Sequence, residues 1–365
     1  MPCVDVSVSC PVYDSFRVQQ VAGMFDVPLK EKVEESFSVE VPDLSEDWEV
    51  SLIVGPSGSG KSTIARQAFG EQLYTKAEWP ADRAVVDCFG ELPTERVIEL
   101  FTAVGFSSPP SWVKPYAVLS NGEQFRCDLA RALGSGESGR GRGRPGSLVV
   151  FDEFTSVVDR NVAKACSTAI AKGVRRGSLP RFVAVTCHYD VAEWLEADWV
   201  LDMATGKLTR RRLRRPEIKL EIHRCGLATW RLFARHHYLS GSLAPSARRY
   251  LATWDGVPVA FVATLPVIGR KGHRRISRLV TLPDFQGMGI GMRVLAEVAS
   301  LHRQEGHRMN ITSSHPALIR HCRNSPLWKS VCVKKTGSSR HGSRMHAGYK
   351  SSAGRAVVSF EYQGL

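Results

Sequence analysis

The residues from Gly55 to Thr63 have the types and spacing needed to hold a nucleoside triphosphate. They read GPSGSGKST and follow an apolar run, Trp48 to Val54, that predicts a strand. Glycines in such a turn let backbone N–H groups approach a phosphate, and the following helix directs its positive end at the same anion. We expect Lys61 to reach the β- and γ-phosphates and Ser62 to ligate Mg²⁺. The expected phosphate-binding residues are Gly55, Ser57, Gly58, Gly60, Lys61, Ser62 and Thr63.

Two carboxylates follow a second predicted strand. The apolar segment Leu148 to Phe151 ends in Asp152 and Glu153. Beside a phosphate-binding loop, the first carboxylate is expected to hold the magnesium ion through water. The second can polarise the attacking water as a general base. Together with the loop, these residues predict hydrolysis of ATP.

A second glycine-rich segment, QGMGIG, lies far downstream. It follows a predicted strand, Arg274 to Leu282, and opens an amphipathic helix that ends near Gln304. Small residues before a helix suit a diphosphate, although the same pattern alone is also typical of a tight turn. The residues expected to contact such an anion are Gln286, Gly287, Gly289 and Gly291.

Three further elements surround this second loop. Alternating apolar residues predict strands over Arg248 to Gly256 and Val257 to Leu265, joined at the hairpin signal Asp255-Gly256. A helix is expected over Ala228 to Gly241.

The first part of the chain, about residues 20 to 206, resembles ABC ATPases. LSNGE, Leu119 to Glu123, is similar to the family's LSGGQ motif. In that family the motif contacts the γ-phosphate bound by a partner subunit, which implies that Ser120 and Gly122 bind nucleotide and that the protein is a homodimer. By the same resemblance Asp159 is the D-loop aspartate and His188 is the switch histidine.

Two departures from the ABC family bear on function. No convincing Q-loop glutamine lies between the phosphate loop and LSNGE. The interval from Lys61 to Ser120 is only 59 positions (120 − 61). A short interval predicts a reduced helical subdomain and favours a machine without membrane subunits. The aromatic residue that stacks on adenine is either Phe25 or Phe37.

Residues 218 to 365 resemble the GNAT acyltransferases, whose diphosphate loop matches the second glycine-rich segment. The resemblance implies acetyl-CoA, or another acyl-CoA, as donor. Two segments are also similar to Mom-type phage enzymes that modify DNA adenine, which implies a His237–Tyr238 pair in catalysis. The candidate bases or substrate contacts are His236, His237, Tyr238, Ser314 and His315.

Charge divides the chain at nearly the same place as the motifs. Residues 1 to 206 carry 20 Lys and Arg against 29 Asp and Glu, whereas residues 207 to 365 carry 29 against 7. A region this basic favours an anionic partner, and nucleic acid is the usual one. We therefore expect an α/β protein with a P-loop ABC ATPase domain at 1–206, a basic linker at 207–217 and a mixed α/β GNAT-like domain at 218–365.

Composition excludes some other classes. The longest apolar stretch, Val257 to Ile268, is too short to span a bilayer, and the nine cysteines form no C-x-x-C pair. We expect a cytoplasmic protein with reduced thiols and no membrane partner.

The sequence predicts an ATPase coupled to an acyltransferase that modifies nucleic acid, such as a base amine. Two alternatives remain open. One is an N-acetyltransferase for a protein or small amine that the ATPase regulates. The other is a non-catalytic, ATP-driven nucleic-acid-binding machine. The whole chain resembles proteins of bacteria, archaea and their phages in which an ABC ATPase is fused to an acetyltransferase domain.

Overall fold

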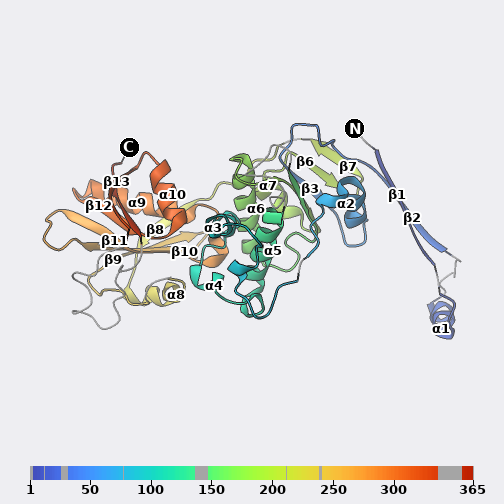
Figure 1. The fold of residues 1–365 in the computed structure, drawn as a ribbon, viewed down its shortest axis with the longest axis horizontal. Coiled ribbons are helices and arrows are strands. Elements are labelled where there is room, and N and C mark those ends of the chain that lie inside the picture. Colours follow the sequence, from blue (N-terminus) through green and yellow to red (C-terminus); the bar gives the residue numbers. More distant parts are fainter. Residues whose placement is uncertain are drawn as a thin grey trace. The chain divides into compact units, whose positions relative to one another are not determined.

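The computed structural model describes residues 3–11, 13–25, 32–76, 78–135, 147–210, 212–237, 241–335 and 356–364. The backbone forms two compact units (Figure 1). The first unit consists of Met1–Thr75, Gly143–Ser156 and Val174–Arg214. The second consists of Lys76–Arg142, Val157–Gly173 and Arg215–Leu365. Helices that the sequence places in the ATPase domain therefore belong to the same compact unit as the acyltransferase-like region.

The first unit is built on a five-stranded sheet with the order β4-β5-β3-β6-β7. Four strands run parallel and β7 pairs antiparallel with β6. Their bounds are β3 Val50–Val54, β4 Leu148–Phe151, β5 Arg181–Thr186, β6 Trp199–Asp202 and β7 Lys207–Arg210. All of β3 and β4 is buried, as expected for parallel strands covered on both faces.

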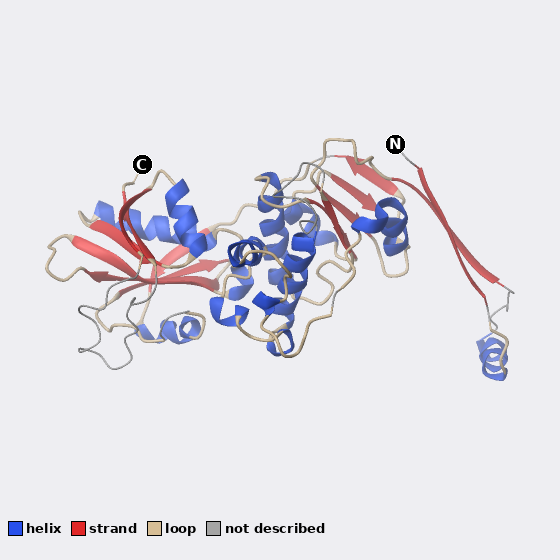
Figure 2. Ribbon diagram, in the orientation of Figure 1, coloured by secondary structure: helices blue, strands red, loops and turns tan. Residues whose placement is uncertain are grey.

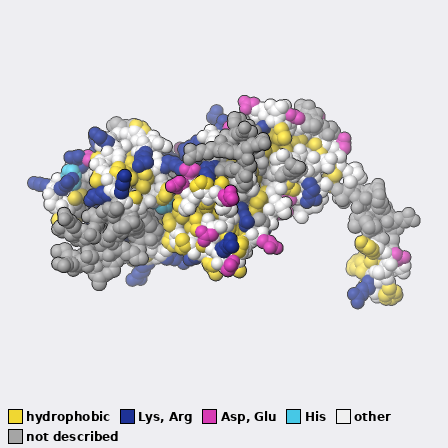
Figure 3. All heavy atoms as spheres, in the orientation of Figure 1, with side chains coloured by type: hydrophobic (Ala, Val, Ile, Leu, Met, Phe, Trp, Pro, Cys, Tyr) yellow, Lys and Arg dark blue, Asp and Glu magenta, His cyan; other side chains and the backbone are white. Residues whose placement is uncertain are grey.

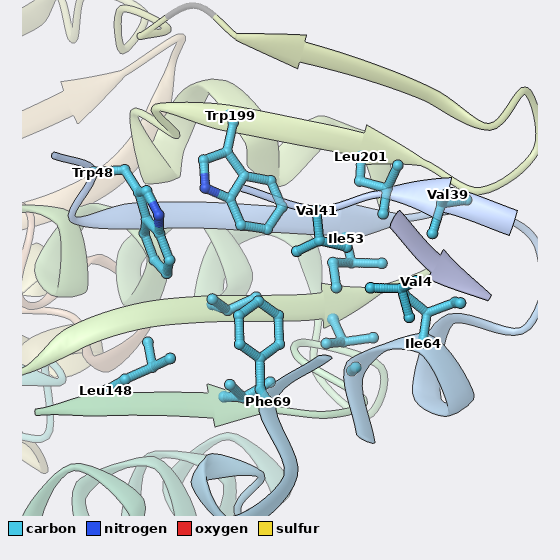
Figure 4. Packing of buried hydrophobic residues seen from close by; sticks show 14 residues of the cluster. Val4, Val39, Val41, Trp48, Ile53, Ile64, Phe69, Leu148, Trp199 and Leu201 are labelled. Carbon is cyan, nitrogen blue, oxygen red and sulfur yellow. The ribbon is translucent and has the colours of Figure 1, made fainter. Parts of the chain in front are cut away.

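A two-stranded antiparallel ribbon, β1 Cys3–Pro11 and β2 Lys32–Glu40, adds to the first unit. Helix α1 Phe16–Phe25 lies between its strands in the chain, and α2 Lys61–Phe69 and α7 Ala192–Leu195 complete the unit. Figure 4 shows the core, in which Val4 and Val39 of the ribbon pack with Ile53 and Ile64. The rings of Trp48 and Trp199 meet edge to face at 5.5 Å. This core fixes β3 and α2, the two elements that flank the first glycine loop.

The second unit begins with helices. They are α3 Thr94–Ala103, α4 Pro109–Trp112, α5 Asn121–Ser135 and α6 Arg160–Arg175. We call residues 78–135 and 157–173 the helical segments. Phe101 lies at their centre and contacts the rings of Phe89, Phe106 and Trp112.

A seven-stranded sheet forms the rest of the second unit, with the order β13-β14-β12-β11-β10-β9-β8. Its only parallel pair in the described chain is β11 with β12. Figure 2 shows α9 and α10 over one face and α8 on the other. The strands are β8 Leu220–Arg224, β9 Arg248–Trp254, β10 Val257–Pro266, β11 His273–Thr281, β12 Arg308–Ser313, β13 Trp328–Lys334 and β14 Val357–Tyr362. The helices are α8 Trp230–Ala234, α9 Ile290–Gln304 and α10 Pro316–Asn324.

Two predicted segments differ from the structure. Lys207–Arg210, expected in a basic linker, form β7, because this stretch pairs with the buried strand β6. The helix expected over residues 228–241 is short, since α8 ends at Ala234. By contrast, Asp255 and Gly256 turn between β9 and β10 with φ of 49° and 78°, as the hairpin signal predicts.

Candidate functional sites

The first glycine loop joins β3 to α2 in a phosphate-binding shape. Gly58 and Gly60 have φ of 81° and 78°, a conformation that glycine adopts without strain. Within the described chain the backbone N–H groups of Gly58, Gly60 and Lys61 have no hydrogen-bond partner. Lys61 is itself buried, and its Nζ donates to the carbonyl of Pro56 at 2.7 Å. The loop can therefore offer several N–H donors and one ammonium group to a triphosphate.

The other residues of this loop also lie as a phosphate site requires. Ser57 is exposed, and Ser62 and Thr63 are partly buried in the first turn of α2. A Cβ built on Gly55 would lie 2.7 Å from Ser59 Oγ, and one on Gly60 would lie 2.8 Å from the ring of Phe37. Close packing thus excludes side chains at both glycines. The ring of Phe37 borders the loop, whereas Phe25 is 71% exposed on α1.

Asp152 and Glu153 follow β4 at the edge where β3 and β5 also end, because these strands are parallel. Glu153 is exposed and adopts a φ of 53°, and Ser156 Oγ donates to its carboxylate at 2.6 Å. His188 lies two residues beyond β5, and its Nδ1 is 3.2 Å from Thr155 Oγ1. The first unit therefore brings the predicted loop, carboxylates and switch histidine to one edge of its sheet.

Thr155 adds a sign of strain at this edge. It is fully buried, is β-branched and has a φ of 66°, which such residues rarely adopt. Strained backbone held by its surroundings is concentrated at functional sites. This signal was not visible in the sequence.

The predicted signature residues lie in the second unit. Ser120 precedes α5 and its Oγ donates to Glu123 at 3.0 Å, while Glu123 accepts a second bond from the Ser120 N–H. The Glu123 N–H donates in turn to Ser120 Oγ at 3.4 Å, which completes a capping box. Although burial opposes ionisation, hydrogen bonds from Ser111 and Ser120 lower the pKa of Glu123. Gly122 occupies the first turn, and Asp159 caps α6 by accepting from Asn161 N at 2.8 Å.

The second glycine loop joins β11 to α9 and repeats the geometry of the first. Gly287 and Gly289 have φ of 87° and 86°, and Gly289 caps α9. Within the described chain the N–H groups of Gly287, Met288 and Gly289 have no hydrogen-bond partner. A Cβ at Gly291 would lie 2.5 Å from Thr281 Oγ1, so the helix packs closely on β11. The loop fits an anionic diphosphate.

The strands beside this loop separate. β11 pairs with β12 only from His273 to Ile276, although β11 continues to Thr281 and β12 continues to Ser313. Beyond Ile276 the two strands are therefore not paired with each other.

Gln286 does not point to a free site. Its Oε1 accepts from Ser107 N and its Nε2 donates to Thr281 O, both at 3.0 Å. It thereby links the second loop to the helical segments. Its contact with a cofactor stays a prediction.

The candidate bases have different surroundings. His315 Nε2 lies 3.2 Å from the carbonyl of Ser107, and burial lowers its pKa. Burial, reinforced by Arg235, also lowers the pKa of His236. His237 follows α8, with its ring 6.0 Å from that of Trp230, and Tyr238 lies outside the described residues. Ser314 is partly buried beside His315. Direct hydrogen bonding to the helical segments indicates a packing role for His315.

A buried polar cluster lies at the far end of α9, and none of the sequence motifs contains it. The His302 side chain is completely buried, with Nε2 3.0 Å from Thr264 Oγ1 and Nδ1 3.2 Å from Glu305. Burial, together with nearby Arg274, lowers the pKa of His302 to about 4. The i, i+3 spacing of His302 and Glu305 on a predicted helix was the available signal.

Part of the second unit is similar to known proteins. Residues 215–320 match the family model described as the acetyltransferase (GNAT) family. No curated protein sequence matches the chain. A GNAT-family protein from Desulfovibrio desulfuricans is 15% identical, with a TM-score of 0.31, and its alignment covers 40% of this chain and 99% of that protein. The ribosomal-protein-S18-alanine N-acetyltransferase from Escherichia coli is 13% identical, with a TM-score of 0.31, and the match covers 40% of this chain and 93% of that one.

A dimeric bacterial ABC transporter cassette is also similar. It is 15% identical, with a TM-score of 0.38, and the match covers 50% of this chain and 93% of the cassette. The match over residues 215–320 agrees with the GNAT resemblance of the second glycine-rich segment. The ABC ATPase resemblance of the first part rests on its motifs. No helix of the described residues is long and apolar enough to cross a membrane.

Proposed function

We propose that this protein is an ATP-hydrolysing homodimer that transfers an acetyl or similar acyl group to an amine of a nucleic-acid base. The observation that carries the proposal is the pair of glycine loops, each with N–H groups directly before a helix that have no partner among the described residues. One loop has the full triphosphate-binding pattern, and the other lies within the GNAT match. Two anion sites of different design support two different phosphate-bearing cofactors.

For the ATPase, the first loop would hold the triphosphate while Ser62 and, through water, Asp152 hold Mg²⁺. Glu153, which is exposed at the end of β4, would orient and deprotonate the attacking water. His188 would contact the γ-phosphate. Ser120 and Gly122 lie on the other unit and would bind the nucleotide held by a partner copy, with Asp159 beside them. A homodimer follows from this division of one site between two chains.

For acyl transfer, the N–H groups of the second loop would bind the diphosphate of acetyl-CoA, which supplies an activated thioester. The part of β11 beyond Ile276, which is not paired with β12, would lie along the thioester. The acceptor amine attacks the carbonyl carbon, a base takes the amine proton, and the thiol leaves after it gains a proton. We assign proton transfer to the His237–Tyr238 pair.

The acceptor is proposed from charge. The 29 Lys and Arg residues after position 206 outnumber acidic residues fourfold (29 against 7). Figure 3 shows Lys and Arg side chains over the face of the region that holds the seven-stranded sheet. Cations spread over a surface bind the phosphate backbone without regard to sequence. A cytoplasmic location, expected from the sequence, stays a prediction.

The test is mass spectrometry of nucleosides from DNA and RNA of cells that express the wild-type chain or Gly289→Glu. The variant puts a carboxylate where the diphosphate would lie. Gly269→Glu is the matched control, because Gly269 also has a positive φ, 77°, and open space around its Cβ position. We expect a mass increase of one acyl group on one nucleoside, present with wild type and the control and absent with Gly289→Glu.

Other results would redirect the proposal. An acyl adduct on protein or small amines, with unmodified nucleosides, would support the regulated N-acetyltransferase instead. Failure of the purified wild-type chain to bind CoA would remove the transferase activity and leave the ATP-driven nucleic-acid-binding machine.

A further inference from the structure

The second glycine loop is held by the helical segments rather than standing free. Arg126 of α5 donates to the carbonyl of Pro283 at 2.9 Å, and Ser107 N donates to Gln286. Lys172 of α6 donates to the carbonyl of Met288 at 2.5 Å. All these residues belong to the second compact unit. Pro283, Gln286 and Met288 are thus each bonded to a different part of the helical segments.

This contact is closely packed. A Cβ on Gly105 would lie 2.8 Å from the carbonyl oxygen of Gln286, and one on Gly287 would lie 2.9 Å from Ala169 Cβ. Both glycines have positive φ, 81° and 87°. On the next helix, Arg320 forms an ion pair with Glu99. Two backbones approach here at a distance that only glycine permits, so the arrangement is specific.

The second loop has no cation of its own. Between Leu282 and Met292 the only charged residue is Asp284, whose carboxylate would oppose an anion. The next residue, Arg293, donates to the carbonyl of Ile218. Since a diphosphate carries two negative charges, its loop gains from a nearby cation. A cation from another segment would therefore strengthen the binding of a diphosphate.

Lys172 is in position to supply that charge. Its Nζ lies 3.1 Å from the Cβ position of Gly289, at the exposed end of the loop, where the N–H groups have no partner among the described residues. Its bond to the carbonyl of Met288 holds the ammonium group beside the N-terminal cap of α9.

We propose that Lys172, a residue of the ATPase-like helical segments, binds the diphosphate of acyl-CoA together with the second loop. The inference rests on the proposed acyl-CoA site. It means that the donor site is shared between the two parts of the fusion and is incomplete in residues 215–365 alone. It also gives one residue of α6 a direct part in binding the acyl donor.

Calorimetric titration of the full chain with CoA tests this role. Lys172→Gln removes the charge but keeps an N–H donor for the carbonyl of Met288, and Lys172→Arg keeps the charge. Loss of a charge-assisted hydrogen bond predicts roughly tenfold to hundredfold weaker binding of CoA by Lys172→Gln, with near wild-type affinity for Lys172→Arg. Lys164→Gln on the same helix is the matched control and should bind as wild type does.

Pantetheine, which lacks the diphosphate, separates binding from loop positioning. Its affinity should be the same for wild type and Lys172→Gln. Equal CoA affinity in these two proteins would overturn the role of Lys172, as would a loss shared by CoA and pantetheine, which would indicate a positioning residue. Absence of CoA binding by the wild type would instead contradict the proposed transferase function. An unfolding midpoint temperature equal to that of the wild type would show that Lys172→Gln is folded.

Discussion

The two glycine loops both present N–H donors to an anion, but they differ in where the positive charge comes from. Each joins a strand to a helix, each has two glycines with φ between 78° and 87°, and each has N–H groups that find no partner in the part of the chain that the structure describes. The first loop carries its own cation, Lys61, and the proposed Mg²⁺ ligand, Ser62. The second has neither, and Lys172 from another segment lies beside it. A loop with its own cation can be recognised from a contiguous motif, whereas a loop that takes its charge from elsewhere depends on tertiary structure.

The largest expected effect is a loss of ATP hydrolysis when the lysine of the first loop is removed. Lys61→Ala should lower ATP hydrolysis by roughly a thousandfold, since removal of one preorganised charge at a reacting phosphate costs that order of rate. CoA affinity should be unchanged. A phosphate-release assay and a CoA titration measure the two effects. Lys76→Ala, which removes an exposed lysine paired with Asp128, is the control. Normal turnover by Lys61→Ala would contradict the ABC assignment.

The second loop should lose its affinity for CoA when its packing against the helical segments is disrupted. Gly287→Val forces a β-branched residue to a φ of 87° and into Ala169, so CoA binding should weaken by roughly a hundredfold or more. ATP binding by the first loop should persist. Gly269→Val has similar φ strain without the clash and serves as control. If both variants bind CoA equally, the close contact of the loop with the helical segments is not needed for the site.

The helices that follow the loops also differ at their far ends. Helix α2 ends on buried Phe69, whereas α9 ends near buried His302, whose pKa is about 4. Because the unfolded chain binds this proton at higher pH than the folded chain, stability falls as pH decreases from 6.5 to 4. The expected contribution is about 3 kcal/mol of unfolding free energy. Denaturant unfolding should show this as a steeper fall of the unfolding free energy between pH 6.5 and 4 in the wild type than in a variant without this imidazole.

His302→Gln tests that contribution, with His307→Gln as control because His307 is more exposed. Only His302→Gln should flatten the slope of stability against pH. The other titrating groups are the same in the wild type and in both variants, so they contribute equally to the three slopes. Parallel slopes for wild type and His302→Gln would show that the buried imidazole is protonated in the folded state.

Local sequence was sufficient for much of this comparison. The strand before Lys61, the buried β4 before Asp152 and the turn at Asp255-Gly256 all follow from apolar runs and turn chemistry. The glycines of both loops were visible in the same way. These features depend on neighbours within a few residues, which a linear pattern contains.

Features that depend on distant partners were not predictable. Lys207–Arg210 read as a basic linker because nothing local shows that β6 needs an antiparallel neighbour. Lys172 and Gly105 bear no motif, and their contacts with the second loop span more than one hundred positions. His302 is neutral only because β9, β10 and α9 bury it together. In each case the partner that decides the role is remote in sequence.

The smallest expected effect tests whether the two loops communicate. Ser120, Gly122 and Asp159, which are expected to meet a partner's ATP, lie in the same compact unit as Lys172 and the second loop. Asp159 caps α6, the helix that carries Lys172. Binding of ATP at one end of this unit should therefore alter CoA affinity at the other, and CoA should alter ATP affinity by the same factor.

We expect about a fivefold change in CoA dissociation constant, the lower range of measured allosteric couplings. Glu153→Gln should hold ATP without hydrolysis and show the full change, whereas Lys61→Ala should show none at any ATP concentration. The Glu153→Gln, Lys172→Gln double variant sharpens the result. If the coupling acts through the ammonium group, CoA affinity in this protein is low and independent of ATP. If ATP still shifts it fivefold, the signal passes through Gln286 and Pro283 instead, and Lys172 only binds the donor.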